Sequence, residues 1–147
     1  MKVSYRIVIP ARMASQRLPG KPLLDIAGRT LIEHVFRRAC QSSASQVVIA
    51  TDDRKIFQSA RDFGAEVVMT SADHESGSDR IAECADQLGW TDRQLIVNLQ
   101  GDEPLIPPAC LDQVASLLES DNAATRIKAI DTRALALQKL GANAQAY

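Results

Sequence analysis

Residues 7–22 read Ile7-Val8-Ile9-Pro10-Ala11-Arg12-Met13-Ala14-Ser15-Gln16-Arg17-Leu18-Pro19-Gly20-Lys21-Pro22, and this stretch is the most informative part of the chain. A short apolar run ends at Pro10 and opens into a glycine-containing loop that carries Arg12, Arg17 and Lys21. In α/β proteins such a loop presents cations and backbone N–H groups to phosphate at the carboxyl edge of a sheet. A solvated basic loop is the alternative. The loop matches neither GxxxxGK[ST] nor GxGxxG, so both of these phosphate-binding motifs are ruled out.

The remaining sequence alternates apolar runs with amphipathic segments. Strands are predicted over Arg6–Pro10, Gln46–Thr51, Glu66–Met69 and Leu95–Leu99. The predicted helices begin after Thr30, after Asp52-Asp53 (ending at Gly64), near Arg80 with Ser78 or Asp79 as its cap, and at Pro107 or Pro108. Continuous apolar strands separated by amphipathic helices predict a three-layer α/β domain with a mostly parallel sheet covered on both faces.

Polar loops follow three of the predicted strands. They are the cationic loop, the segment Ser71–Asp79, and the segment Gln100–Pro104. The carboxyl ends of parallel strands meet at one edge of a sheet, where open α/β sheets bind their ligands. We therefore expect the three loops to converge on one site.

Composition excludes several other classes of protein. The 147 residues fit one domain, with 46% hydrophobic and 24% charged residues and a net charge of −1. This balance gives no electrostatic reason to bind nucleic acid or an anionic membrane, and neither a membrane span nor a signal-peptide core is evident. Cys40, Cys84 and Cys110 are predicted to be buried thiols in a reducing compartment, which favours the cytoplasm.

Three motifs together resemble a known family. They are Pro10-Ala-Arg-x-x-Ser-x-Arg-Leu-Pro-Gly-Lys21, Ala72-Asp-His-Glu-Ser-Gly-Ser-Asp-Arg80 and Val97-Asn-Leu-Gln-Gly-Asp-Glu-Pro104. The residues and the order of these motifs resemble those of the sugar-activating cytidylyltransferases, most closely the 3-deoxy-manno-octulosonate (KDO) cytidylyltransferases. The resemblance extends from about Tyr5 to about Asn122. The resemblance implies a nucleotide-diphospho-sugar transferase-like fold. It also implies transfer of CMP from CTP to KDO, with release of pyrophosphate, for lipopolysaccharide biosynthesis.

The resemblance also assigns residue roles. Arg12 and Lys21 would clasp the triphosphate and act in catalysis, because they neutralise charge that builds on the attacked α-phosphate. Asp102 would bind Mg²⁺, although the bare pattern fits a turn-capping aspartate equally well. The expected substrate-binding residues are Pro10, Ala11, Arg17, Ser76, Gly77, Ser78, Arg80 and Gln100. The implied partners are CTP and an acidic sugar, with no nucleic acid and no membrane, and a homodimer is left open.

The resemblance ends before the chain does. Residues 1–122 are predicted to form an incomplete cytidylyltransferase-like nucleotide-binding domain, and residues 123–147 a helix-favouring tail of unknown origin, without Gly or Pro from 109 to 140. Relatives are expected to be considerably longer, with most of their sugar-binding residues in the second half. Two functions therefore remain open: a cytidylyltransferase acting on KDO or on another acidic sugar such as sialic acid, and a catalytically inactive CTP-binding remnant.

Overall fold

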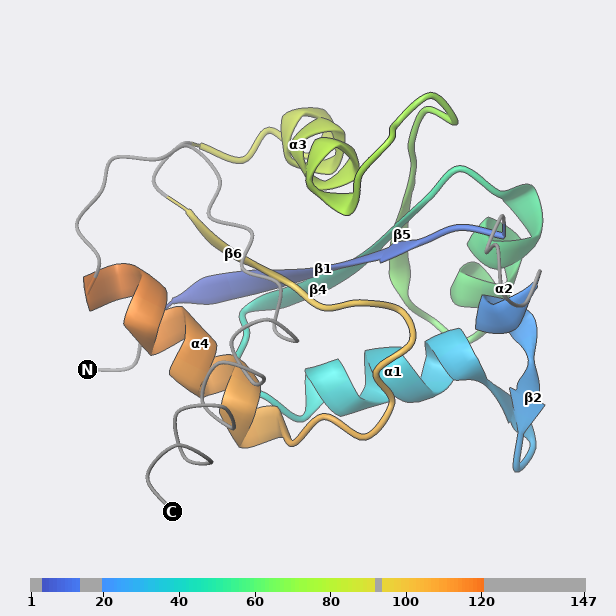
Figure 1. Cartoon of the computed structure of the whole chain (residues 1–147), viewed down its shortest axis with the longest axis horizontal. Helices are drawn as coiled ribbons and strands as arrows, with labels where there is room; N and C mark the ends of the chain where they lie inside the picture. Colours follow the sequence, from blue (N-terminus) through green and yellow to red (C-terminus); the bar gives the residue numbers. More distant parts are fainter. Residues whose placement is uncertain (1–3, 14–19, 92–93, 121–147) are drawn as a thin grey trace, which may run out of the picture.

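A computed structural model of the chain describes residues 4–13, 20–91 and 94–120. Its centre is a four-stranded parallel sheet of order β5-β4-β1-β6 (Figure 1). The strands are β1 (Tyr5–Ala11), β4 (Gln46–Thr51), β5 (Glu66–Met69) and β6 (Leu95–Asn98). The helices are α1 (Leu31–Cys40), α2 (Arg54–Asp62), α3 (Gly77–Gln87) and α4 (Pro108–Ser120), with a 3-10 turn η1 (Lys21–Leu23). The predicted strands and helix order are confirmed to within a residue or two, apart from the start of α3.

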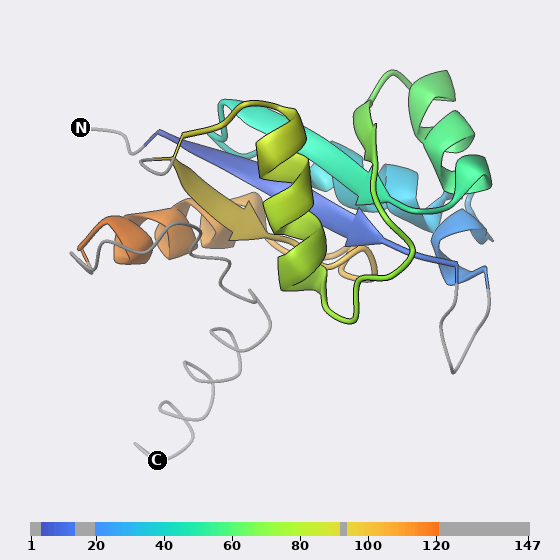
Figure 2. The ribbon, with the colours of Figure 1, turned by 90° about the horizontal axis from the view of Figure 1, so that it is seen from above.

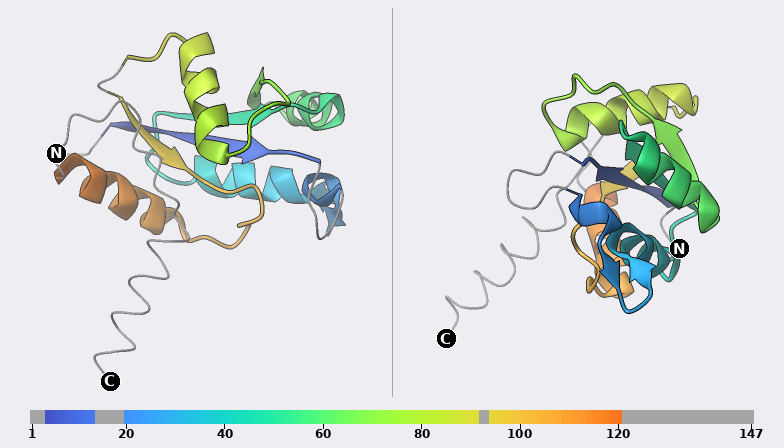
Figure 3. Two further views of the ribbon diagram at one scale, coloured as in Figure 1. Left: turned by 45° about the horizontal axis from the view of Figure 1, so that its top comes forward. Right: turned by 90° about the vertical axis from the view of Figure 1, so that its right-hand side faces the viewer.

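Both faces of the sheet are buried, as the continuous apolar strands predict. Ile7 and Ile9 of β1 face one way and pack with residues of α1, α2 and α4, whereas Val8 faces the other way and packs with α3. Figure 3 shows this layering, with α3 on one side of the sheet and α1 and α4 on the other. The predicted three-layer fold class is therefore confirmed.

The helices begin at side-chain caps that leave their first turns anchored next to strand ends. Thr30 caps α1 by accepting a hydrogen bond from the backbone N–H of Glu33, and Asp53 caps α2. The prediction for α3 was wrong: its cap is Ser76, whose hydroxyl accepts from the N–H of Asp79 at 3.2 Å, so the helix starts at Gly77. Because a capping oxygen must reach the third N–H of the helix, the Ser76–Asp79 spacing selects Ser76 over Ser78.

A small hairpin between β1 and α1 was not predicted. Strands β2 (Asp25–Ile26) and β3 (Arg29–Thr30) pair antiparallel through a two-residue turn at Ala27 and Gly28. Both turn residues have positive φ, 55° and 87°, as tight hairpin turns require. Alanine at the first turn position is unusual, which explains why the pattern gave no hairpin signal.

The cysteine prediction holds for only one of the three thiols. Cys84 is buried on α3, and its burial raises its pKa to about 12. Cys110 is half-buried, and Cys40 is exposed because it falls at the end of α1, past the last residue that faces the sheet. No helix in the described part of the chain is long and apolar enough to cross a membrane. The tail predicted after residue 122 lies outside the described residues.

Strand order fixes where a ligand can enter. From β1 the chain moves outward to β4 and β5, then returns to place β6 on the other side of β1. Viewed from above, β1 and β6 lie side by side beneath α3 (Figure 2). The strand order thus reverses at β1, and the carboxyl ends of strands at such a reversal are the usual ligand position in open α/β sheets.

Candidate functional site

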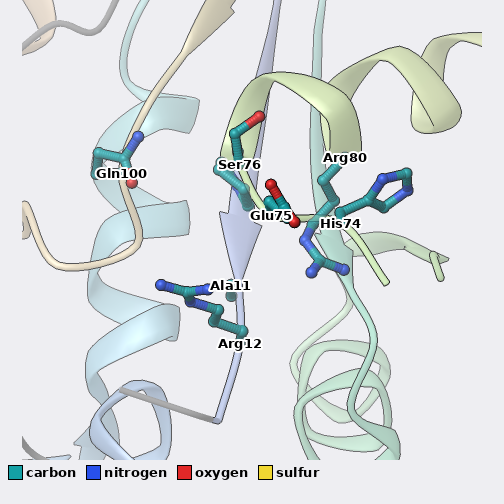
Figure 4. A pocket seen from close by; sticks show the side chains of 9 residues that line it. Ala11, Arg12, His74, Glu75, Ser76, Arg80 and Gln100 are labelled. Atoms are coloured by element: carbon teal, nitrogen blue, oxygen red, sulfur yellow. The ribbon is translucent and has the colours of Figure 1, made fainter. Parts of the chain in front are cut away.

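A pocket occupies the crevice between the ends of β1 and β6. It is lined by Pro10, Ala11, Arg12, His74, Glu75, Ser76, Gly77, Arg80 and Gln100. Figure 4 shows Gln100 on one side of this pocket, Arg80 and His74 on the other, and Arg12 at its lower edge. The three loops that the sequence analysis expected to converge do so here.

A second hollow, called the outer hollow below, adjoins this first pocket, which is called the inner hollow. Its lining consists of Pro10, Ala11, Arg12, Lys21, Pro22, Gln100, Gly101 and Asp102. Pro10, Ala11, Arg12 and Gln100 belong to both linings, so the two hollows share a wall. We refer to the two adjoining hollows as the cleft; their linings reach from Gly77 at the start of α3 to Lys21 and Asp102.

Two glycines make room for this cleft. A Cβ atom on Gly77 would meet Pro10, Asn98 and Gln100 at 3.5–3.9 Å, so the absent side chain leaves space inside the pocket wall. A Cβ on Gly101 would come within 3.3 Å of the Pro10 carbonyl oxygen, which is tighter than normal contact. Gly101 therefore lets the loop after β6 lie close against the end of β1.

Lys21 and Asp102 face each other at the outer hollow. The Lys21 Nζ atom lies 3.5 Å from Asp102 Oδ2, and each side chain is 40% exposed. Lys21 is held in place because Gly20 adopts a left-handed φ of 76° and donates its N–H to the Met13 carbonyl at 3.2 Å. Arg12 is also exposed, and it forms no ion pair with any of the described residues. The outer hollow therefore presents two cationic side chains and one carboxylate to solvent.

Arg80, in contrast, is buried. Its guanidinium Nη1 donates to the Thr70 hydroxyl and to the Ser71 carbonyl (3.3 Å), and its Nη2 donates to Asp52 Oδ2 at 3.4 Å. Only 4% of its side chain is exposed. Arg80 thus lines the pocket while its charge is compensated from behind.

The loop before α3 is fixed by Glu83. Its carboxylate accepts from the backbone N–H of Ser71 at 3.0 and 3.1 Å and from Gln87 Nε2 at 3.1 Å, and it lies 3.4 Å from His74 Nε2. Sequence reasoning treated His74 as a loop residue and did not single out Glu75, although both line the pocket. Both residues lie in the same polar loop as Ser76, and this position in the sequence could have indicated that they line the site.

The structure brings most of the predicted site residues together. Those that line one or both hollows are Pro10, Ala11, Arg12, Lys21, Ser76, Gly77, Arg80, Gln100 and Asp102. Ser78 is exposed on α3 and belongs to neither lining. Arg17 lies outside the described residues.

The donor set limits the kind of metal site that could form here. Among the residues that the structure describes, no cluster of three or more His, Cys, Asp or Glu side chains could enclose a metal ion. Mg²⁺ does not need such a cluster, because it binds through one or two carboxylates and completes its shell with phosphate and water. The half-exposed carboxylate of Asp102, beside two cations, fits Mg²⁺ bound with a phosphate ligand.

Fold and site together define an α/β domain whose cleft has an exposed cationic side at Arg12 and Lys21 and a second side at the buried, charge-compensated Arg80. The family model described as "Cytidylyltransferase" matches residues 6–144. The chain belongs to the cytidylyltransferase family.

Particular relatives narrow this assignment. The chain is 60% identical over 117 residues to the 3-deoxy-manno-octulosonate cytidylyltransferase of Thioalkalivibrio sulfidiphilus (strain HL-EbGR7), covering 80% of this chain and 47% of that protein. It is 55% identical over 120 residues to the enzyme of the same name from Haemophilus influenzae (strain PittEE), covering 82% and 47%. A solved structure of CMP:2-keto-3-deoxy-manno-octonic acid synthetase complexed with CTP matches with a TM-score of 0.71 and 42% identity, over 82% of this chain and 49% of that one. The chain thus spans about half the length of the relatives it matches.

Proposed function

We propose that the chain is the nucleotide-binding part of an enzyme that transfers CMP from CTP to KDO and releases pyrophosphate. One observation carries the proposal: Arg12, Lys21, Gln100 and Asp102 meet at a single cleft at the strand-order switch between β1 and β6. The proposed substrates, CTP and KDO, are inferred from the names of the related proteins. We further propose that the reaction belongs to lipopolysaccharide biosynthesis in the cytoplasm.

The reaction is a direct displacement at phosphorus. A hydroxyl oxygen of the sugar attacks the α-phosphorus of CTP, the bond to the bridging oxygen of the β-phosphate breaks, and pyrophosphate leaves. Arg12 and Lys21 hold the phosphate oxygens and neutralise the charge that builds on them. Asp102 is the residue that would hold Mg²⁺, which supplies further charge neutralisation when bound. Pro10, Ala11, Ser76, Gly77, Arg80 and Gln100, with Arg17 and Ser78 as sequence-based additions, form the substrate-binding set.

Two alternatives remain within the same family. The first is a CTP-binding remnant without turnover. The second is transfer of CMP to another acidic sugar such as sialic acid. We also keep two sequence-based predictions as part of the proposal: a nucleotide-binding domain over residues 1–122 followed by a separate tail, and a homodimeric state.

Calorimetry and a pyrophosphate-release assay test the proposal together. With Mg²⁺ present, the 147-residue protein should bind CTP more tightly than ATP or GTP, and an absence of CTP binding would overturn the nucleotide-binding role. Pyrophosphate release should then be measured with CTP and either KDO or sialic acid, beside a full-length relative. Pyrophosphate release with KDO but not with sialic acid supports transfer of CMP to KDO. Pyrophosphate release with sialic acid supports the second alternative, and CTP binding without any pyrophosphate release supports the remnant.

A further inference from the structure

Behind the pocket, three polar side chains from different elements meet. Arg80 lies on α3, Thr70 follows β5, and Asp52 follows β4. Arg80 is 3% exposed and Thr70 is 6% exposed, while Asp52 retains 20% of its side-chain exposure. A buried guanidinium is unfavourable unless acceptors surround it, so the positions of Thr70 and Asp52 determine where the Arg80 guanidinium lies.

The same guanidinium forms part of the pocket wall. Arg80 lines the inner hollow together with Ser76 and Gly77, and Gln100 faces it from the loop after β6 (Figure 4). Its hydrogen bonds to Thr70, to the Ser71 carbonyl and to Asp52 all run away from β6, toward the ends of β5 and β4. Any shift of these acceptors would therefore move the wall that a ligand contacts.

Charge compensation distinguishes the two sides of the cleft. Asp52 balances Arg80, whereas Arg12 forms no ion pair with the described residues. The Arg12 side suits a polyanion such as a triphosphate. On the Arg80 side the guanidinium is compensated by Asp52 and Glu75 adds a carboxylate to the lining, so this side suits the neutral polar groups of a nucleoside better than phosphate.

We propose that Asp52 and Thr70 are positioning residues for the nucleoside, acting through Arg80. They hold the guanidinium at the inner pocket and cancel its charge, so that the triphosphate is directed to the Arg12 and Lys21 side. This inference rests on the proposed function, because it assumes that a nucleotide occupies the cleft.

The test compares two probes on the complete 147-residue protein. Tripolyphosphate carries the phosphates without the nucleoside, and CTP carries both. Thr70→Val keeps the shape of the side chain but removes the hydroxyl, one of the three acceptors that hold Arg80. We expect it to raise the Kd for CTP about tenfold and to leave the Kd for tripolyphosphate within about twofold. Thr70→Ser restores the hydroxyl and should recover most of the CTP affinity.

Asp52→Asn provides a second, independent variant in case Thr70→Val fails to fold. Removing its charge should raise the Kd for CTP and lower the Kd for tripolyphosphate, because the charge on Arg80 is then uncompensated. Asp62→Asn is the matched control: Asp62 lies at the other end of α2 and bonds only to Gln58 in the described hydrogen-bond network. A Kd that rises for CTP but does not rise for tripolyphosphate supports the inference.

Two results would overturn it. If the folded variants leave both Kd values unchanged, or raise the Kd for CTP and the Kd for tripolyphosphate equally, Asp52 and Thr70 have only a structural role. The proposed function then stands. If the unaltered protein binds CTP no more tightly than tripolyphosphate, the proposed function itself fails, and this inference fails with it.

Discussion

The Lys21 Nζ atom lies 3.5 Å from Asp102 Oδ2, although the two residues are 81 positions apart in the sequence. Their side chains are 40% exposed, and an ion pair in such surroundings contributes no more than about 1 kcal/mol to stability. The pair therefore has little value for folding. Its importance is that the fold places the predicted phosphate-binding cation and the predicted Mg²⁺ ligand at one mouth of the cleft.

Lys21→Ala should weaken CTP binding with little loss of stability. Loss of a charge-assisted contact to phosphate typically costs about 1.5–3 kcal/mol, which corresponds to roughly a 10- to 150-fold rise in Kd. Calorimetry with CTP and Mg²⁺ measures this rise. Lys55→Ala removes the same charge from an exposed site on α2 and serves as the control. Equal affinities for the two variants would remove Lys21 from the phosphate site.

Asp102→Asn should abolish the dependence of CTP binding on Mg²⁺. The carboxamide keeps the size of the side chain but is a poor Mg²⁺ ligand, so the ratio of Kd values measured with EDTA and with Mg²⁺ should fall toward one. The exposed Asp86 on α3 offers a control substitution, Asp86→Asn, that leaves the ratio unchanged. An Asp102→Asn protein that still binds CTP more tightly with Mg²⁺ would show that the metal is held elsewhere.

Gly77→Ala should separate stability from binding. Gly77 is not among the glycines with positive φ, and its added Cβ would meet neighbours only at ordinary distances, so the helix accepts alanine without strain. Alanine favours the helix, and the melting temperature should stay equal or rise. Because the methyl group occupies pocket space, the Kd for CTP should rise about tenfold or more. A lower melting temperature with unchanged Kd would contradict the view that this space serves the ligand.

Tyr5→Phe should lower stability, and the effect should depend on pH. The Tyr5 hydroxyl donates to Asp112 Oδ1 at 2.5 Å and so ties β1 to α4; losing a hydrogen bond to a charged acceptor costs about 1.5–3 kcal/mol. Burial, reinforced by Asp112, raises the pKa of Tyr5 well above its ordinary value.

The raised pKa fixes the sign of the pH effect. The folded state binds the phenol proton more tightly than the unfolded state, so the stabilisation is fully present below about pH 10 and is lost as pH rises through the folded pKa. Urea unfolding at pH 8 and above pH 10 should show the gap between the two proteins narrowing. A gap that widens with pH would contradict this assignment.

Much of the fold follows from local pattern. The apolar runs at 46–51 and 66–69 and the caps at Thr30 and Asp53 were sufficient to place strands and helices, because these signals depend on neighbours close in the sequence. The β2–β3 hairpin was missed since Ala27, with its φ of 55°, gives no local turn signal. The start of α3 was misplaced because several residues in the loop before it are competent caps, and only the Ser76–Asp79 bond selects one.

The sequence by itself determined which residue types the site contains: the cations at 12 and 21, the glycine-containing loop before α3, and the carboxylate at 102. Only the tertiary structure decided their surroundings. It exposes Arg12, pairs Lys21 with Asp102, and buries Arg80 against Thr70 and Asp52. The reason is physical: periodicity and capping act over a few residues, whereas burial and charge pairing depend on which strand ends the parallel sheet brings side by side.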